Sequence, residues 1–399
     1  MTALGNRKAR TCAALGVGLV AALWGAEASA ASGVIEGRFT FTQRTGGYCD
    51  SASMDCAGSK YDSTDYDTAQ PLRHARLEVR DGNFNYLGSC GTDKNGDFEC
   101  SWSSSGTPSN LYVYFRFEDK NQRFIVYQNN GTDRWYYRKS VNPQLSNQSV
   151  GTVNVPAYGF TSLYDVMQRS YYGFLKKSGL MQSRFTGIKV LYDHPDSGGW
   201  ANGAQKRIQM GFNRTNTINA AHEAGHIADY LAKPRNSHNG WGYNSNSGHS
   251  PESHEWRGFA ISEALADLVA VGAYWSLSSS NEPRLCMYEA TDECTTDPDL
   301  DMETADGSCG MSGPNNSRTR VATTRFFWDI IDSNDSVDAN LYDIYEMIDS
   351  LPAGDNWGQA DSAASDMDSF HQWEFATQFN ALRGINVSTP YFNNCMGHF

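Results

Sequence analysis

Basic side chains are scarce in this sequence. Its 32 lysine and arginine residues are outnumbered by 45 acidic residues, which gives a net charge of −13. Proteins that bind nucleic acid neutralise phosphates with cationic side chains, so this balance excludes nucleic acid as the expected partner. Only 19% of the 399 residues are charged, whereas 40% are hydrophobic. This composition excludes a disordered chain and indicates a globular protein of two or three folded units.

A hydrophobic run long enough to span a membrane is also missing, since a spanning helix takes about 20 residues. The apolar segment at residues 12–24 is too short, and no later segment is long and apolar enough. Arg7, Lys8 and Arg10 precede this segment, and the small residues 28–30 follow it. This order is typical of a secretory signal peptide. We expect cleavage near Ala30, removal of residues 1–30 and a secreted mature protein with no membrane attachment.

No CxxC pair is present, which argues against a zinc site built from cysteines. Eight cysteines remain once the predicted signal peptide is removed, and an even set is typical of disulfides in an oxidising compartment. Many pairings are possible. Closeness in sequence favours the pairs Cys49–Cys56, Cys90–Cys100 and Cys286–Cys294, which leaves Cys309 for Cys395.

Residues 31–155 show the period-two alternation of short β-strands, for example at residues 75–79, 98–102 and 111–117. Turn sequences rich in Asp, Asn and Gly separate these strands. The pattern predicts an all-β sandwich as an accessory domain, and its arrangement resembles the transthyretin-like modules of many secreted enzymes. The acidic turn at residues 93–97 is interpreted either as an ordinary hairpin turn or as a calcium loop.

The periodicity changes after Pro156. Ser162 is expected to cap an amphipathic helix that ends at Gly179, and residues 188–192 and 206–210 are typical of strands, with a turn region at 198–203 between them. Helical patterns dominate the remainder. We therefore expect a multidomain protein in which an α+β domain with a mainly helical C-terminal part covers residues 156–399.

The motif HExxH occurs at His222, Glu223 and His226. On a helix, a spacing of four residues places both imidazoles on one face about one turn apart, where they can bind one zinc ion. Glu223 would then lie beside the metal and act as the general base that takes a proton from water. Gly225 costs this helix about 1 kcal/mol. The alternative is a core helix with two hydrogen-bonded histidines.

A catalytic zinc needs a third protein ligand. The metzincin extension requires a glycine and a histidine where Asp229 and Ala232 stand, so that subclass is excluded. Farther along, Glu263 and Asp267 are four residues apart on an otherwise apolar helix, where a buried unpaired carboxylate would be costly. A metal bond from Glu263 and a hydrogen bond from Asp267 to a ligating histidine would remove that cost. The alternative is a solvated helix edge.

These residues resemble the gluzincin metallopeptidases, the thermolysin-like group, in which a second helix carries a glutamate ligand and, four residues later, an aspartate. The resemblance implies a zincin-like domain, with His222, His226 and Glu263 as zinc ligands, Glu223 as general base and Asp267 orienting a histidine. It also implies a zinc endopeptidase that acts on protein or peptide substrates. Residues 200–205 weakly resemble the region that leads to the substrate-holding edge strand. The 36 residues between His226 and Glu263 form a longer gap than the compact thermolysin pattern has.

Several assignments stay open at this level. The group that stabilises the oxyanion is unassigned, and alternative ligands or substrate contacts lie in the connecting loop. The oxyanion candidates are Tyr243, Arg320, Tyr342, Tyr345 and His371, and the loop histidines are His238, His249 and His254. The acidic run at residues 297–303 is either a calcium loop or a solvated loop. Other candidate functions are an adhesin or carbohydrate-binding protein with a structural metal, and a metalloamidase acting on cell-wall or glycosylated peptides.

Overall fold

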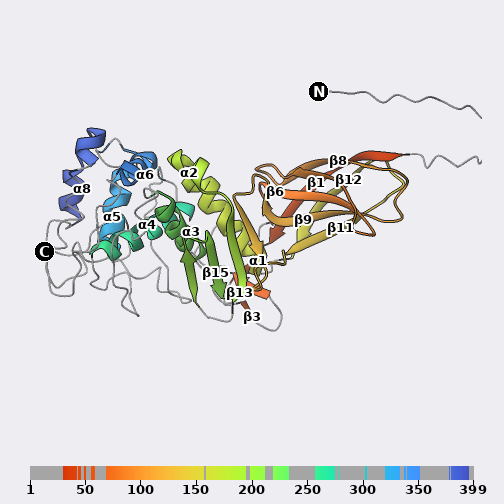
Figure 1. Ribbon diagram of the computed structural model, residues 1–399, viewed down its shortest axis with the longest axis horizontal. Coiled ribbons are helices and arrows are strands. Elements are labelled where there is room, and N and C mark those ends of the chain that lie inside the picture. The colour runs from red at the N-terminus through yellow and green to blue at the C-terminus, as the bar shows by residue number, and fades with distance from the viewer. Residues whose placement is uncertain are drawn as a thin grey trace, which may run out of the picture.

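The structure is a computed structural model in which strands gather at one end of the molecule and helices at the other (Figure 1). The described residues are 30–42, 44–45, 49–50, 55–58, 69–156, 159–194, 198–211, 219–232, 257–274, 277, 302, 320–332, 337, 339–350, 377 and 379–394. The coarse expectation of a strand-rich N-terminal region followed by a region that contains helices is confirmed.

The first sheet is built around the long strand β1 (Ala31–Thr42). On one side, β12 (Asn147–Val155) pairs with β1 in parallel. On the other side, β8 (Asp97–Ser104) and β5 (Ala69–Pro71) pair antiparallel with the first and the last part of β1. Strand β1 therefore lies in the centre of its sheet.

The second sheet has eight strands in the order β14-β15-β13-β10-β9-β6-β7, and β11 also pairs with β9. Their bounds are β6 Ala75–Asp81, β7 Tyr86–Gly91, β9 Leu111–Asp119, β10 Phe124–Tyr127, β11 Tyr136–Val141, β13 Ile188–His194, β14 Gly199–Asn202 and β15 Arg207–Gly211. Three short strands form a separate sheet, namely β2 Arg44–Thr45, β3 Cys49–Asp50 and β4 Asp55–Gly58.

The first sheet faces strands β6, β7, β9 and β11 of the second sheet across an aromatic and aliphatic core. Along β8, residues 98, 100 and 102 are buried in alternation with the exposed residues 99, 101 and 103, as the period-two pattern predicts. Phe39 of the first sheet packs against Phe115 of the second, with ring centroids 5.2 Å apart. Gly88 lets β7 approach β8 closely, because a Cβ atom there would lie 2.2 Å from the carbonyl oxygen of Ser101. The facing sheets therefore form a sandwich.

The disulfide Cys90–Cys100 joins β7 to β8 and so crosslinks the two sheets, which confirms this predicted pair. The backbones of Cys49 and Cys56 lie directly opposite each other in the pairing of β3 with β4. The remaining predicted pairs, Cys286–Cys294 and Cys309–Cys395, lie outside the described residues.

The acidic turn at residues 93–97 is a tight, internally hydrogen-bonded turn, but it is not a hairpin turn, because it joins β7 of the second sheet to β8 of the first. The Asp93 side chain accepts hydrogen bonds from the backbone N–H groups of Asn95 and Asp97 at 2.7 and 3.0 Å. Gly96 has φ of 78°, a conformation that glycine adopts without strain. Asp97 pairs with Arg38 at 2.6 Å. The Asp93 carboxylate thus stabilises the turn itself, and the Asp97 carboxylate joins it to β1. Of the second acidic run, only the buried Met302 is described.

One sheet continues from the sandwich into the second part of the chain. β10 lies within the range expected for the sandwich, yet it pairs in parallel with β13 from beyond residue 156. Its link to β9 is the pairing of Ile125 with Glu118. At this junction the Tyr172 hydroxyl donates to Asp119 at 2.8 Å, and the Tyr164 hydroxyl donates to the carbonyl oxygen of Arg73 at 2.9 Å. Backbone pairing and side-chain contacts therefore join the two parts.

The expected helix from Ser162 to Gly179 differs in detail. α1 (Gly159–Gln168) begins before Ser162, which lies inside it, and continues as a π-helical turn (Arg169–Phe174) and a 3-10 turn (Leu175–Ser178). Tyr171 and Phe174 are both buried within the π-helical turn. Gly179 ends this segment with φ of 66°, as expected for a C-terminal glycine.

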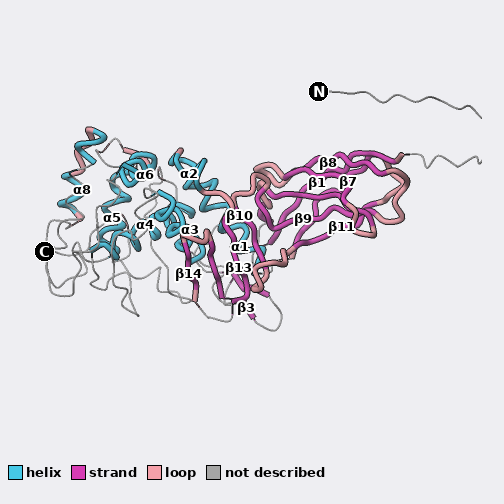
Figure 2. Tube along the Cα trace, viewed as in Figure 1, coloured by secondary structure: helices cyan, strands magenta, loops and turns pink. Residues whose placement is uncertain are grey.

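The remaining helices cover the far end of the second sheet, away from the sandwich (Figure 2). They are α2 Leu180–Arg184, α3 Asn219–Ala232, α4 Arg257–Tyr274, α5 Arg320–Ile331, α6 Leu341–Ser350 and α8 Ser388–Asn393. The two expected strands are present as β13 and β15, but the expected turn region at 198–203 contains the edge strand β14. Among the described residues, no helix is both long and apolar enough to cross a membrane.

We expect that replacing Cys90 and Cys100 together by alanine lowers the free energy of unfolding by about 2 to 3 kcal/mol. The crosslink closes a loop with a sequence separation of 10 residues, so its removal restores conformational freedom to the unfolded chain. Urea unfolding of the full chain measures the change. Ser103→Ala, at an exposed position of β8, is the control. An unchanged urea midpoint in the double variant would show that the bond contributes nothing.

Candidate metal centre

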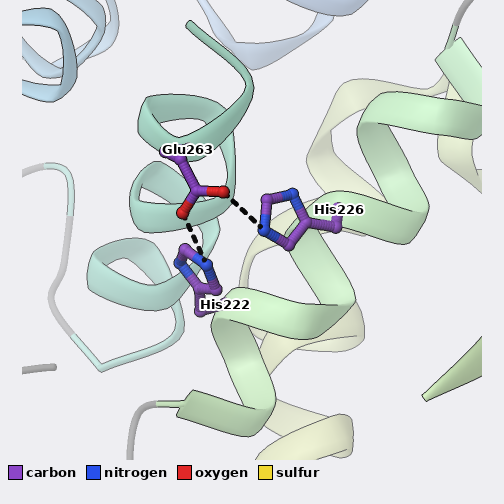
Figure 3. A group of neighbouring side chains, drawn as sticks. All are labelled: His222, His226 and Glu263. Atoms are coloured by element: carbon purple, nitrogen blue, oxygen red, sulfur yellow. Dashed lines mark ion pairs between the residues drawn. The ribbon is translucent and has the colours of Figure 1, made fainter. Parts of the chain in front are cut away.

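Two histidines project from one face of α3, as the four-residue spacing predicts. The rings of His222 and His226 are nearly perpendicular, at 86°, with centroids 4.6 Å apart (Figure 3). Both rings face α4, the helix that packs along α3. His222 is buried, whereas His226 keeps 22% of its side chain exposed. The pair therefore has a buried side and a side open to solvent.

Glu263 of α4 reaches both histidines. One carboxylate oxygen lies 3.2 Å from Nε2 of His222, and the other lies 3.3 Å from Nε2 of His226. The three ligand atoms lie within 4.8 Å of one another, so this group can hold a metal ion. Two ligand atoms at about 2.0 to 2.1 Å from a tetrahedral zinc are themselves about 3.3 Å apart. The spacing and the donor set of two imidazoles and a carboxylate therefore fit zinc.

Asp267 lies behind the first histidine, one turn along α4 from Glu263. Its Oδ1 is 2.7 Å from Nδ1 of His222, and its side chain is fully buried. A hydrogen bond at Nδ1 fixes the tautomer of the imidazole and directs Nε2 away from the bond, toward Glu263. Both acids are buried, which contradicts the alternative of a solvated helix edge.

The charges of this group depend on one another. Burial by itself lowers the pKa of His222, but hydrogen bonds to Asp267 and Glu263 outweigh it and raise the pKa well above its ordinary value. Burial likewise raises the pKa of Glu263, and the charges and hydrogen bonds of His226 and His222 reverse the effect and hold it well below the ordinary value. The group is therefore a network of ion pairs. The histidines stabilise the charged form of the glutamate, and the acids stabilise the charged form of His222, so the cost of burying each charge is offset.

Glu223 follows the first histidine and lies at the edge of the sheet. Its side chain is buried, and a Cβ atom built on Gly199 would come within 3.2 Å of its Oε1 atom. Gly199 begins β14, the last strand of the eight-stranded sheet. The absence of a side chain at Gly199 thus leaves the carboxylate next to the backbone of an edge strand. Sequence reasoning missed this role, because the glycines around residue 199 are typical of a turn.

Gly225 sets the distance between the two helices that carry the ligands. A Cβ atom on Gly225 would lie 2.5 Å from the Cα atom and 2.8 Å from the carbonyl oxygen of Ala266. Neither backbone atom can move without moving its helix. Glycine at this position lowers the helix propensity of α3, but it is required for the close packing of α3 on α4. A glycine inside a helical pattern was the available sequence signal.

A second polar contact ties the same helices one turn beyond His226. Ser262, next to Glu263, donates a hydrogen bond to the buried Asp229 at 3.2 Å. Asp229 occupies the position that excluded the metzincin pattern. Burial of the Tyr345 phenol, together with the negative charge of Asp229, raises the pKa of Tyr345. Asp229 therefore holds helices in place, a role that its position in the motif did not reveal.

The candidates for oxyanion stabilisation are only partly described. Tyr342 donates a hydrogen bond to Glu346, one turn along α6. Tyr345 is fully buried beside Asp229, with no exposure to solvent. Both contacts belong to the packing of α6. The remaining candidates lie outside the described residues or, for Arg320, have no described side chain: Tyr243, Arg320 and His371, with the loop histidines His238, His249 and His254.

Comparison with known proteins identifies no family. Neither the protein-family models nor the curated proteins include a match to this chain. Among solved structures, a 9R-lipoxygenase from Cyanothece PCC8801 aligns with 20% identity and a TM-score of 0.18. The alignment covers 32% of this chain and spans 17% of the lipoxygenase chain. A likeness at that TM-score indicates neither a shared fold nor a shared activity.

Replacing Gly225 by alanine should weaken zinc binding about 5- to 140-fold, because forcing a methyl group between two helix backbones costs about 1 to 3 kcal/mol. Helix propensity alone would have the opposite sign, a gain of about 1 kcal/mol. Competition with a chromophoric chelator measures the affinity. Gly173→Ala is the matched control, since the nearest atom to its added Cβ, the carbonyl oxygen of Ala273, is 4.0 Å away. Equal affinities of the two variants would contradict this account of Gly225.

Asp267→Asn should lower zinc affinity about 10- to 100-fold, since the imidazole of His222 loses the carboxylate that orients it. The same competition assay measures the change, and circular dichroism checks the fold. Asp165→Asn serves as the control, because Asp165 is another buried helical aspartate and pairs with Arg169 at 2.8 Å. If both variants bind zinc as the unmodified protein does, Asp267 has no part in the metal site.

Proposed function

We propose that this protein is a secreted zinc metallopeptidase of the gluzincin type, with a zincin-like domain behind an N-terminal β-sandwich. The observation that carries the proposal is the convergence of His222, His226 and Glu263, with Asp267 bonded to the far nitrogen of His222. These residues come from two helices and stand in the order and roles of the HExxH and ExxxD motifs. Nothing in the comparisons bears on this assignment.

The ligand count supports a catalytic rather than a structural metal. Structural zinc sites are closed by four protein ligands, whereas catalytic sites have three and keep one position for water or substrate. Within the part of the chain that is described, three ligands converge and the side chain of His226 is partly exposed. This difference favours an enzyme over an adhesin with a structural metal.

A zinc ion held by these ligands would supply Lewis acidity, which polarises a carbonyl group and makes water more acidic. Glu223 supplies the proton transfers. Its carboxylate takes a proton from the water whose oxygen attacks the carbonyl carbon of the scissile peptide. As the carbon–nitrogen bond breaks, the same carboxyl group gives that proton to the leaving nitrogen, so a carboxylic acid and an amine are released, and the acid then loses its remaining proton to the amine or to solvent. The Glu223 carboxylate is buried beside the edge strand β14.

The edge strand β14 supports a peptide as substrate. Its one partner among the described strands is β15, so the other side of β14 offers backbone N–H and carbonyl groups to an extended chain. Gly199 brings this edge next to Glu223. Trp200, the next residue, is 38% exposed, with the guanidinium of Arg207 5.7 Å from its ring. A peptide added to β14 would therefore run past the general base.

The proposed export agrees with the crosslink that the structure describes. The disulfide Cys90–Cys100 is of a kind that persists in oxidising compartments. The predicted signal peptide, residues 1–30, lies almost entirely outside the described residues. A secreted protein with this pair of features would meet protein substrates outside the cell.

Glu223→Gln should retain zinc and lose hydrolysis by at least about a hundredfold, because the amide has the size of the carboxylate but cannot accept the proton. Cleavage of denatured casein, with and without a chelator, measures activity, and metal analysis of the same sample measures zinc. Chelator-sensitive cleavage by the unmodified protein is the matching positive result. A zinc-loaded Glu223→Gln protein with full activity would exclude the mechanism, and a zinc-loaded but inert unmodified protein would exclude the peptidase.

A further inference from the structure

The outer face of the second sheet, on the sandwich end, carries aromatic and charged side chains rather than the small polar residues of an ordinary solvated face. The strands lie in the order β7-β6-β9-β11, and alternate residues of each point away from the core. We call this surface the outer face. Its side chains are those of Phe84, Tyr86, Arg76, Glu78, Arg80, Tyr112, Tyr114, Arg116, Glu118, Arg134, Tyr136 and Arg138.

Three exposed aromatic rings lie on this face. Phe84, Tyr86 and Tyr136 are 51%, 55% and 45% exposed, and among the described residues Trp200, at 38%, is the only other exposed large aromatic side chain. Phe84 and Tyr136 pack on the buried ring of Tyr114, whose centroid lies 5.9 Å from that of Phe84 and 5.3 Å from that of Tyr136. Exposed aromatic clusters of this kind mark interaction sites.

Phe84 is held in a conformation that its own side chain disfavours. Its φ is 66°, in the left-handed region that asparagine and glycine enter far more readily than a bulky residue does. The carbonyl oxygen of Phe84 accepts a hydrogen bond from Arg80 at 2.6 Å, which fixes the turn. A half-exposed phenylalanine at such a position gains little from burial, so packing does not explain it. Strain of this type is concentrated at functional sites.

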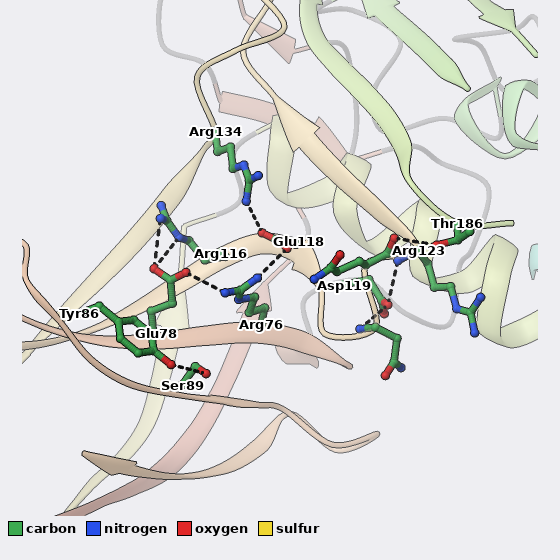
Figure 4. Close-up of polar contacts among 12 residues, drawn as sticks. Arg76, Glu78, Tyr86, Ser89, Arg116, Glu118, Asp119, Arg123, Arg134 and Thr186 are labelled. Atoms are coloured by element: carbon green, nitrogen blue, oxygen red, sulfur yellow. Dashed lines mark hydrogen bonds and ion pairs between the residues drawn. The ribbon is translucent and has the colours of Figure 1, made fainter. Parts of the chain in front are cut away.

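Four arginines of the outer face pair with two glutamates, and Figure 4 shows Arg76, Arg116 and Arg134 with Glu78 and Glu118. Glu78 pairs with Arg80 at 2.8 Å and with Arg116 at 3.1 Å. Glu118 in turn pairs with Arg76 at 3.2 Å and with Arg134 at 2.7 Å. Both glutamates are buried although they lie on the outward side of the sheet. The guanidinium groups are thereby held in place, so little side-chain entropy is lost when they bind a ligand.

The charge of the face is opposite to that of the chain. Five arginines stand against two glutamates there, whereas the whole sequence has a net charge of −13. The fifth, Arg138, is exposed and lies 5.1 Å from the ring centroid of Tyr112. A local cationic surface on an acidic protein complements an anionic ligand.

We infer that the outer face binds an acidic polysaccharide, a chain of sugar rings that carry carboxylate groups. The apolar faces of sugar rings stack on the exposed aromatic rings, the hydroxyls accept hydrogen bonds from the fixed guanidinium groups, and the carboxylates pair with the excess of positive charge. A peptide is a poorer fit, because peptides add to a free strand edge or fill a groove, and the centre of this face has its backbone groups paired within the sheet. The site is independent of the proposed peptidase and adds a second function.

The experiment uses the full mature chain and polygalacturonate as the probe. The unmodified protein should be retarded in polygalacturonate affinity gels, and the retardation should fall as sodium chloride is raised, because screening weakens the guanidinium contacts. Phe84→Gly and Arg138→Gln should each weaken binding about tenfold or more, as loss of an interface anchor does. Phe84→Gly also relieves the backbone conformation, so its thermal unfolding temperature should not fall. Leu382→Ala, at a 47% exposed apolar position on the helical end, is the control.

Neutral starch and poly-L-glutamate are run beside the probe. Selective retardation by polygalacturonate, lost in the two variants and kept in the control, supports the inference. Equal binding of starch would remove the acidic requirement, and equal binding of poly-L-glutamate would show a general anion surface rather than a polysaccharide site. No binding of any polymer, or losses equal in Leu382→Ala, would overturn the site. Casein hydrolysis by the same samples is scored separately, so failure of either function is seen on its own.

Discussion

The close contact between α3 and α4 is the constraint on which the group of His222, His226 and Glu263, the candidate metal centre, depends. Gly225 lies against the backbone of Ala266, and that contact allows imidazoles from one helix to meet a carboxylate from the other. Such burial is expensive for any single ionisable group, and here each charge is offset by its neighbours. Asp229 and Ser262 secure the same pair of helices from the other end. The chemistry of the site thus follows from how tightly two backbones pack.

The parts of the site that sequence predicts are the local ones. His222 and His226 share a helix face because helical periodicity alone places them there. Glu263 and Asp267 were found by a chemical argument, since two acids on an apolar helix need partners. Gly199 and the edge strand β14 were not predicted, because their structure depends on pairing with β15 and on Glu223, which approaches from a separate helix. Contacts between distant segments leave no period in the sequence.

The same distinction applies to the fold. The alternation in residues 31–155 predicts strands and a sandwich, and the alternating burial of β8 agrees with it. It does not say which sheet a short apolar run joins, and residues 124–127 pair with β13 rather than staying wholly within the sandwich. Likewise, Ser162 has the chemistry of a cap but lies inside α1, because the helix begins at Gly159. In the same way, the ion pair of Glu78 with Arg116 cannot be predicted from the sequence, because it forms only when β6 and β9 are neighbours in the sheet. Arg76, on the same strand as Glu78, reaches Glu118 of β9 for the same reason.

The sheet that runs from β7 to β14 has a consequence for how the chain is made. When synthesis has passed residue 155, the sandwich strands are all present, but β10 still lacks the neighbour that residues 188–194 supply. Until then its backbone groups form an open edge to which another nascent chain can add. The segment that follows, α1 and its continuation, packs on a face of this sheet, where the Tyr164 ring lies 5.4 Å from that of Phe124. The helix therefore covers apolar side chains of the growing sheet, while the edge of β10 stays open until β13 pairs with it.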